Sequence, residues 1–234
     1  MVKSELIKRS PLRVFEKSIN GGLGKGNLGV LASRKGVGKT ACLVHLATDQ
    51  LFNDKHVIHV SFSSRVDHIV SWYEDIFKEI SKMRDLENAV SVHDEIVKNR
   101  VIMNFNQEGI STDQILKSIS AMITDGNFAA DQVLFDGYDF GETSMEDIAK
   151  FKTFAQDHQL EIWFSVSLKP EEPCFDDEGF PVQLKAFTES LDVIITLAYA
   201  GDHVKLRAVK DHGNTELNNM HLMLDPKTML IARE

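Results

Sequence analysis

The sequence predicts an α/β fold with a mainly parallel β-sheet, helices on both of its faces, and β-hairpins at the C-terminus. Short apolar runs rich in β-branched residues alternate with helical patterns over most of the chain, which is typical of a parallel sheet covered on both faces. The last third instead contains strand-like runs joined by turn residues, and this pattern is typical of hairpins.

The first half of the chain predicts two strand–helix units. A strand is expected at residues 28–33, followed by a glycine-rich turn and a helix through Ala47, and a second strand is expected at 56–62. The next helix carries apolar residues at spacings of three and four: Val66, Ile69, Val70, Tyr73, Ile76, Phe77 and Ile80. A second, more polar helix then precedes a strand at 101–105.

Two capping patterns mark the helices of the middle region. Ser111 and Gln114 form a capping-box pattern before the apolar residues of one helix, and Ser144 and Asp147 open another. The expected buried positions of these helices are Ile115, Ile119, Met122, Ile123, Ile148, Phe151 and Phe154. Strands are expected at 132–135 and 162–166, which completes the alternating core.

The last third changes character. Residues 169–182 hold three of the five prolines and many acidic residues, so we expect a long loop there. Strands at 193–198 and 203–209 flank a Gly-Asp turn, and strands at 221–224 and 229–232 flank an Asp-Pro turn. Because no linker or repeat interrupts the chain, we expect one domain over 1–234 with a core of about 12–214.

Composition excludes several classes of protein. The net charge of −9 disfavours a broad electrostatic grip on nucleic acid. Cys42 and Cys174 form no CxxC pair, so the sequence implies neither a disulfide framework nor a zinc knuckle. The catalytic motifs GxSxG and HExxH do not occur either. No apolar run approaches the roughly 20 residues of a membrane span, and no apolar core follows the basic first residues. We therefore expect a cytoplasmic protein without membrane association.

The segment LGVLASRKGVGKTACLVHL carries the clearest functional signal, because it predicts a strand, a glycine turn and a helix in succession. In such a loop, backbone N–H groups and the helix N-terminus hold phosphate, Lys39 reaches the β- and γ-phosphates, and Thr40 binds Mg²⁺. Ser33 replaces the first glycine of the strict pattern. The expected ATP-binding residues are Ser33, Arg34, Lys35, Gly36, Val37, Gly38, Lys39, Thr40 and Ala41.

Asp136 is the second candidate for binding Mg²⁺. It ends the apolar strand VLF, and a phosphate-loop site needs a carboxylate at such a place to hold the ion or its water shell. The alternative is an ordinary strand-terminal aspartate that caps a loop. Since a phosphate loop precedes it in the chain, we favour the Mg²⁺ role.

At these positions the chain resembles the KaiC/RadA/DnaB branch of the RecA-type P-loop ATPases. INGGLGKGNLGVLASRKGVGKTA is similar to the approach and phosphate loop of KaiC-like proteins, with Ala32 and Ser33 closer to DnaB-type helicases. VLFDGYD resembles the Walker B strand, and DVIITLAYAGDHVKLRAVKDHGN resembles the late strands and basic motif. The resemblance covers about 12–214. It implies a RecA-like ATP-binding domain, rings or filaments, and a polar sensor at Ser165 or Ser167.

Two departures from the family fall at catalytic positions. Where the family carries a glutamate as general base, this chain has Ser63 and Ser64, which cannot replace a carboxylate worth about 10²–10⁴-fold in rate. Asp67 is a candidate substitute on the following helix. The family also presents a Lys and, two residues later, an Arg to a neighbouring subunit's γ-phosphate. Lys210 matches that Lys, but His212 replaces the Arg, and both could equally be solvated hairpin residues.

We therefore expect an ATP-binding, RecA/KaiC-like protein with weak or lost ATP hydrolysis and a role in regulation or assembly. Lys39, Asp136 and Lys210 are the candidate catalytic residues, with ATP and Mg²⁺ as cofactors. A homo-oligomer or a protein partner is expected, and nucleic acid is the least expected partner. Two alternatives stay open: a protein-interaction module with a vestigial nucleotide site, and an active DNA-dependent ATPase.

Overall fold

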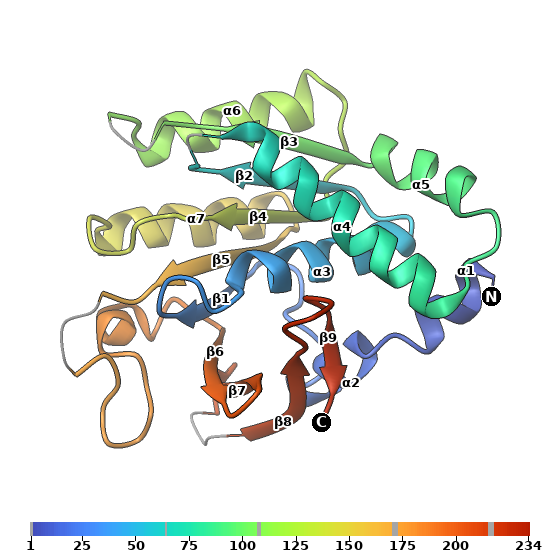
Figure 1. Cartoon of the computed structure of the whole chain (residues 1–234). Coiled ribbons are helices and arrows are strands. Elements are labelled where there is room, and N and C mark those ends of the chain that lie inside the picture. Colours follow the sequence, from blue (N-terminus) through green and yellow to red (C-terminus); the bar gives the residue numbers. More distant parts are fainter. Residues whose placement is uncertain (1, 64, 107–108, 170–172, 215–217) are drawn as a thin grey trace.

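The computed structural model describes residues 2–63, 65–106, 109–169, 173–214 and 218–234 (Figure 1). Its described strands form one nine-stranded sheet in the order β3-β2-β4-β5-β1-β6-β7-β8-β9. The pairs from β3 to β6 in this order are parallel, and the pairs from β6 to β9 are antiparallel. The expected α/β class, with a mainly parallel sheet and C-terminal hairpins, is confirmed.

The parallel region alternates strands and helices. Its elements are β1 (Asn27–Ser33), α3 (Lys39–Phe52), β2 (Val57–Ser61), α4 (Val66–Arg84), α5 (Ala89–Lys98), β3 (Arg100–Asn104), α6 (Thr112–Thr124), β4 (Gln132–Asp136), α7 (Met145–Asp157) and β5 (Glu161–Ser167). The C-terminal region contains the short helix η1 (Val182–Phe187), β6 (Val193–Ala200), β7 (His203–Asp211), β8 (Asn218–Leu224) and β9 (Ile231–Arg233). Two short helices, α1 (Lys3–Lys8) and α2 (Leu12–Ser18), precede β1.

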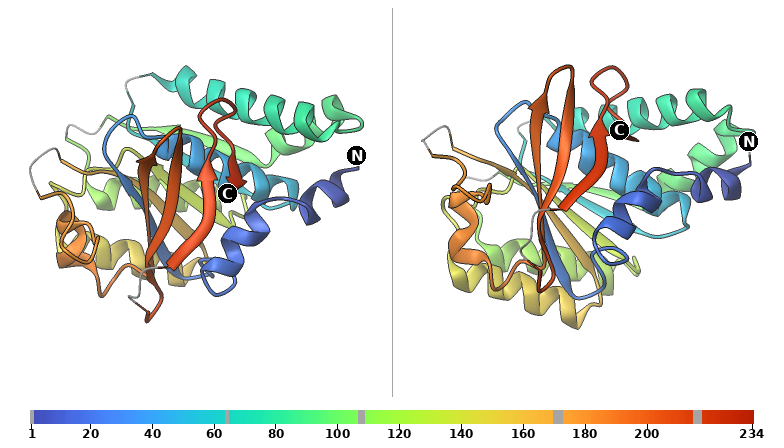
Figure 2. Two further views of the ribbon diagram at one scale, coloured as in Figure 1. Left: turned by 60° about the horizontal axis from the view of Figure 1, so that its bottom comes forward. Right: turned by 90° about the horizontal axis from the view of Figure 1, so that it is seen from below.

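Helices cover both faces of the parallel part of the sheet (Figures 1 and 2). Leu31 of β1 packs in the core layer that holds α3, α4 and α5, whereas its neighbours Val30 and Ala32 pack in the layer that holds α6 and α7. This alternation follows from the period of two in a strand. The strands are therefore buried on both sides, as their apolar sequences predicted.

The antiparallel strands twist away from the parallel part and return toward α3 (Figure 2). Leu222 and Leu224 of β8 and Ile231 of β9 belong to the same core layer as Leu43 of α3. The backbone N–H of Ile231 donates to Nδ1 of His45 over 2.9 Å. As a result α3 is buried almost completely, between the sheet, α4 and the last hairpin.

Several local predictions can be compared directly with the structure. Both capping boxes are confirmed, with Ser111 and Ser144 as the N-caps of α6 and α7. The helix expected to end near Ala47 continues to Phe52, and β8 begins before the expected residue 221. Helices α1, α2 and η1 were not predicted. Within the described residues, no helix combines the length and apolarity needed to cross a membrane.

Candidate functional site

The candidate residues meet at the carboxyl edge of the parallel sheet, where β1, β2, β4 and β5 end. Asp136 at the end of β4 lies between Ser61 of β2 and Ser165 of β5 in the strand register. On the other side of β5, Ser165 is paired with Leu31 of β1, two residues before Ser33. Neighbouring parallel strands thus bring Asp136 close to the loop that follows β1.

The loop between β1 and α3 depends on two glycines with positive φ. Gly36 has φ +84° and Gly38 has φ +116°, a region that other L-residues rarely adopt. A Cβ atom at Gly38 would also lie 2.2 Å from Cδ2 of Leu224 on β8, so the Leu224 side chain would have to shift. The last hairpin therefore packs directly against the turn that opens α3.

The amide groups of this loop are available to an anion. In the described part of the chain, no hydrogen bond is donated by the backbone N–H groups of residues 36–41, and the first backbone bond of α3 is donated by Cys42 to Gly38. Unpaired amides at a helix N-terminus carry partial positive charge and point toward a ligand position. This arrangement suits a phosphate group.

Lys39 lies folded back over the same loop. Its Nζ donates to the carbonyl oxygens of Ser33 and Arg34 over 3.2 and 3.0 Å, and lies 3.1 Å from Ser33 Oγ. Burial lowers the pKa of Lys39 to about 8, although the nearby Asp136 carboxylate partly opposes the shift. The ammonium group is held mainly by neutral oxygens, so an incoming phosphate would supply the negative charge that it lacks.

Thr40 and Asp136 form the second half of the site. The Thr40 hydroxyl lies 3.1 and 3.0 Å from the two carboxylate oxygens of Asp136. Ser165 Oγ donates to the same carboxylate over 2.6 Å and accepts from the Gly137 N–H over 2.9 Å. Ser165 thereby fixes the orientation of Asp136. The expected role of Ser165 or Ser167 as a polar sensor stays a prediction.

The spacing of these oxygens fits a magnesium ion. Two ligands at right angles on an octahedral Mg²⁺, each about 2.1 Å from the ion, lie about 3 Å apart. The hydroxyl of Thr40 and the carboxylate of Asp136 are separated by this distance. Among the described residues, no group of three or more His, Cys, Asp or Glu side chains could hold a metal ion. Phosphate and water would therefore supply the other ligands, as is usual for Mg²⁺.

The expected position of the general base contains no free carboxylate among the residues described there. Ser63 Oγ accepts from the N–H of Arg65 over 3.2 Å, while Ser64 lies outside the described residues. Asp67 is exposed in the first turn of α4 and forms an ion pair with Arg65 at 2.8 Å. The hydrogen bond from Arg65 lowers the pKa of Asp67, which makes its carboxylate a weaker base.

Lys210 is not brought to the phosphate loop. It pairs with Ile194 near the beginning of β6, and its Nζ donates to the carbonyl oxygens of Thr188 and Leu191, each over 2.5 Å. The side chain points toward the segment that precedes β6, whereas the phosphate loop follows the opposite end of β1, which runs parallel to β6. Lys210 therefore takes no part in the cluster of Lys39, Thr40 and Asp136.

His212 lies close to Lys210, and both of its ring nitrogens also have partners within the protein. Its Nδ1 lies 2.7 Å from a carboxylate oxygen of Asp211, and its Nε2 lies 3.2 Å from the carbonyl oxygen of Leu23. The residue is half-buried and has a positive φ of 54°. The predicted basic motif thus joins β7 to the segment before β1.

Two features of the site were missed in the sequence. The packing of Leu224 against Gly38 joins residues from opposite ends of the chain, and no local pattern indicates it. His59 of β2 is fully buried in the core layer on the α3 side, where its Nδ1 lies 3.1 Å from the hydroxyl of Tyr73. Burial lowers the pKa of His59 to about 4. One sequence signal could have indicated this position. Because side chains alternate along a strand, His59 faces the side opposite to Ile58 and Val60, which is the side of α3 and α4.

Comparison with known proteins adds no family assignment. No protein-family model matches the chain, and a search of curated proteins finds no significant match.

Proposed function

We propose that this chain binds MgATP at the loop between β1 and α3 and hydrolyses it slowly or not at all, as a RecA/KaiC-like protein with a role in regulation or assembly. The observation that best supports this proposal lies at the N-terminus of α3. There, backbone N–H groups without hydrogen-bond partners, Lys39 and the Thr40–Asp136 pair lie close together. Phosphate would replace the loop oxygens around Lys39. Thr40 and Asp136 would hold Mg²⁺, and the ion would neutralise the negative charge of the phosphates.

Slow hydrolysis is supported by the groups beside the site. Activation of water requires a base within hydrogen-bond reach of the γ-phosphate. Asp136 is engaged by Thr40 and Ser165, and Asp67 is neutralised by Arg65. No residue at the place of the family glutamate carries a carboxylate. Binding energy for the nucleotide is therefore retained, whereas the group that would accelerate its cleavage is missing.

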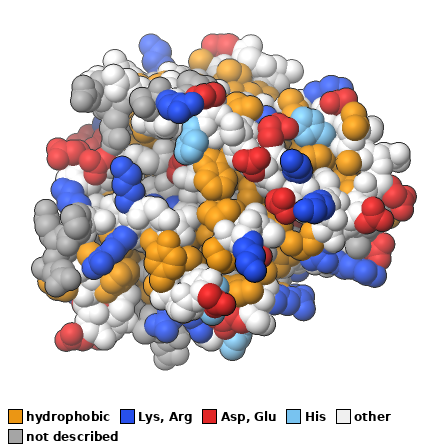
Figure 3. Space-filling view, in the orientation of Figure 1, with side chains coloured by type: hydrophobic (Ala, Val, Ile, Leu, Met, Phe, Trp, Pro, Cys, Tyr) orange, Lys and Arg blue, Asp and Glu red, His pale blue; other side chains and the backbone are white. Residues whose placement is uncertain are grey.

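One alternative has some support. The contacts of Lys39 with the oxygens of its own loop are those expected of a vestigial site that no longer takes nucleotide, in a protein-interaction module. In contrast, a DNA-dependent ATPase gains no support. Basic and acidic side chains are interspersed on the face in Figure 3, and the net charge is −9, so no continuous basic surface faces the viewer.

Calorimetric titration with MgATP separates the proposal from the vestigial-site alternative. We expect a single site with a Kd in roughly the micromolar range. At about 100 times the Kd, linkage should stabilise the folded protein by about 2.7 kcal/mol, which is measurable as a higher Tm. Neither heat nor a change in Tm at millimolar MgATP would overturn the proposal and favour the alternative.

A further inference from the structure

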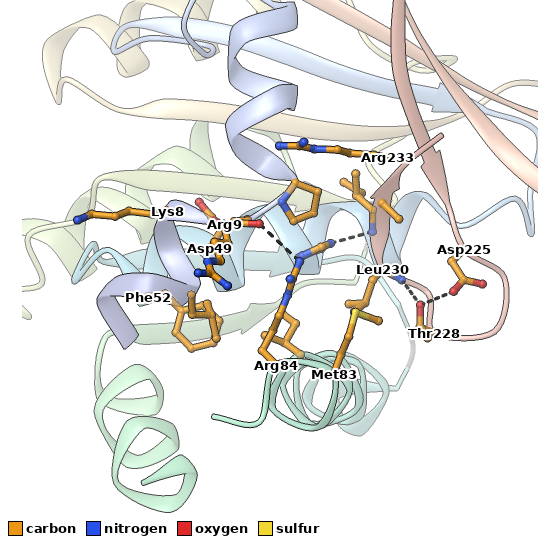
Figure 4. A pocket seen from close by; sticks show the side chains of 17 residues that line it. Lys8, Arg9, Asp49, Phe52, Met83, Arg84, Asp225, Thr228, Leu230 and Arg233 are labelled. Atoms are coloured by element: carbon orange, nitrogen blue, oxygen red, sulfur yellow. Dashed lines mark hydrogen bonds between the residues drawn. The ribbon is translucent and has the colours of Figure 1, made fainter. Parts of the chain in front are cut away.

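A cavity lies away from the phosphate loop. It has a volume of about 520 Å³ and is enclosed by α1 and the residues after it, α3, the end of α4, and the β8–β9 hairpin (Figure 4). Its size is within the range of small-molecule sites, about 300–1,000 Å³. Neither the phosphate loop nor Asp136 contributes to its lining, so the cavity is a separate feature of the molecule.

Basic side chains dominate the charge of this cavity. Lys8, Arg9, Arg84 and Arg233 line it, against the carboxylates of Asp49 and Asp225. Over the ranges that the structure describes, none of the three residues Lys8, Arg84 and Arg233 forms an ion pair with a carboxylate. Figure 4 shows Arg84 extending from α4 into the cavity, where its Nη2 approaches the carbonyl oxygen of Arg9 at 3.5 Å.

The two acidic groups are already engaged within the protein. Asp49 is 4% exposed and forms an ion pair with Arg13 of α2. Asp225 accepts hydrogen bonds from the Thr228 hydroxyl over 3.0 Å and from the Lys227 N–H over 2.9 Å. Arg13 compensates the charge of Asp49, whereas Asp225 has only neutral donors and keeps its negative charge. Lys8, Arg84 and Arg233 together outweigh that one carboxylate, so the net charge around the cavity is positive.

The rest of the wall is apolar. Leu6, Phe52, Ile80, Leu230 and Ile231 line the cavity and are each at most 7% exposed. Met83, which is 53% exposed, also contributes to the lining. An apolar chamber with cationic groups matches a ligand that has an apolar body and an anionic head.

His45 offers a buried donor in the same chamber. The side chain lines the cavity, is 4% exposed, and accepts the Ile231 N–H at Nδ1. Burial lowers its pKa to about 4, so near neutral pH the ring is uncharged and carries its proton on Nε2. Among the described residues, Nε2 of His45 is not one of the buried side-chain atoms that lack a partner, and because the side chain lines the cavity, its Nε2–H is accessible from there.

From these observations we infer that the cavity is a binding site for a small organic anion, a carboxylate attached to an apolar chain. Arg84 and Arg233 hold the carboxylate of the ligand, and the Nε2–H of His45 is a further donor. The apolar chain of the ligand lies against Phe52, Leu230 and the neighbouring apolar wall. This inference is independent of nucleotide binding, because the two sites share no lining residue.

Calorimetry with the full-length chain tests the inference with decanoate as probe and decanol as its neutral analogue. Decanoate should bind at one site and at least about tenfold more tightly than decanol, and added NaCl should weaken the binding of decanoate more than that of decanol. The variants Arg84→Gln and Arg233→Gln, separately and together, remove the cations and leave a shorter, uncharged polar side chain. The matched control is Arg207→Gln, an exposed arginine of β7 outside the cavity.

The double variant should lose at least about tenfold in decanoate affinity, with decanol affinity unchanged and Tm equal to that of Arg207→Gln. If one variant folds poorly, the inference is still tested by the other single variant and by the salt dependence of decanoate binding to the unmodified chain. The inference is overturned if decanoate does not bind at millimolar concentration, if decanol binds equally well, or if the double variant binds decanoate like the unmodified chain.

Discussion

Lys39 and Lys210 make an instructive comparison. Lys39 was expected at the phosphates of its own loop, whereas the family resemblance placed Lys210 at the γ-phosphate of a neighbouring subunit, with a solvated hairpin residue as the alternative. Both are nearly buried, and burial lowers the pKa of each. Lys39 contacts oxygens of a loop whose amides are unpaired, whereas Lys210 binds two carbonyl oxygens that precede β6. On the proposed function, the groups that surround the ammonium, and not burial or motif alone, would make Lys39 a ligand-binding residue.

The largest expected effect is on nucleotide affinity in Lys39→Ala. Loss of charge-assisted hydrogen bonds to phosphate, each worth about 1.5–3 kcal/mol, should weaken MgATP binding by about a hundredfold. The urea midpoint without nucleotide should fall by a smaller amount, because Ser33 is fully buried but the other partner, the carbonyl oxygen of Arg34, belongs to an exposed residue. Calorimetry and urea unfolding measure the two quantities. An unchanged affinity would remove the distinction between the two lysines.

Lys210→Met should show the reverse behaviour. Removing the ammonium leaves the carbonyl oxygens of Thr188 and Leu191 without their donor, and we expect a loss of about 2 kcal/mol in the free energy of unfolding. MgATP affinity should be unchanged. Lys205→Met is the matched control on the same strand. Its more exposed ion pair with Glu234 should contribute at most about 1 kcal/mol.

If Lys210→Met instead keeps its stability and loses nucleotide affinity, the lysine serves a nucleotide, for example that of a neighbouring subunit. Urea unfolding and calorimetry on the same preparation distinguish these outcomes.

A smaller effect should follow from pH. The pKa of Lys39 is lowered to about 8 by burial, so the free protein carries the charged ammonium at pH 7 and has lost most of it at pH 9. Phosphate binding requires the charged form, and affinity for MgATP should therefore fall by about tenfold from pH 7 to pH 9. Lys39→Arg, whose guanidinium stays protonated, should show a flat profile over this range. A flat profile in the unmodified chain would contradict the role of Lys39.

The smallest expected effect is in Asp136→Asn. The amide oxygen can still accept from Thr40 and Ser165, but the negative charge toward Mg²⁺ is lost. We expect about a fivefold weaker affinity for MgATP, equivalent to about 1 kcal/mol, and no change for ATP in EDTA. Titrations with and without Mg²⁺ measure this difference. An equal loss under both conditions would indicate a role for Asp136 in shaping the loop instead.

Local chemistry explains why part of this architecture could be predicted. Ser111 and Ser144 lie next to the groups that they cap, and the glycines at 36 and 38 lie inside the loop that they permit. The meeting of Asp136 with Thr40 follows from a general property of parallel sheets, whose carboxyl ends form one edge. The caps and the loop glycines can be predicted from short segments of sequence, and the position of Asp136 beside Thr40 can be predicted from the order of parallel strands.

The remaining features depend on contacts between distant segments. The fit of Leu224 against Gly38, the bond between His45 and Ile231, and the attachment of Lys210 to Thr188 each join separate elements. The short helix α2 carries no strong helical signal of its own, and its Phe15 and Leu12 are buried in the layer that holds α3. Tertiary packing stabilises such elements, so sequence patterns alone did not indicate them.

Single-turnover kinetics test the central claim most directly: protein in excess over labelled ATP, with Mg²⁺, followed by separation of bound ATP from ADP. Our account predicts that ATP is bound and remains uncleaved over many minutes, because Ser63 and Ser64 stand at the position of the family glutamate and, among the described residues, Asp67 is paired with Arg65. Appearance of ADP at about 1 s⁻¹ or faster, within the range of ordinary enzymes, would contradict it and direct attention to Asp67, Asp139 and residues of a neighbouring subunit.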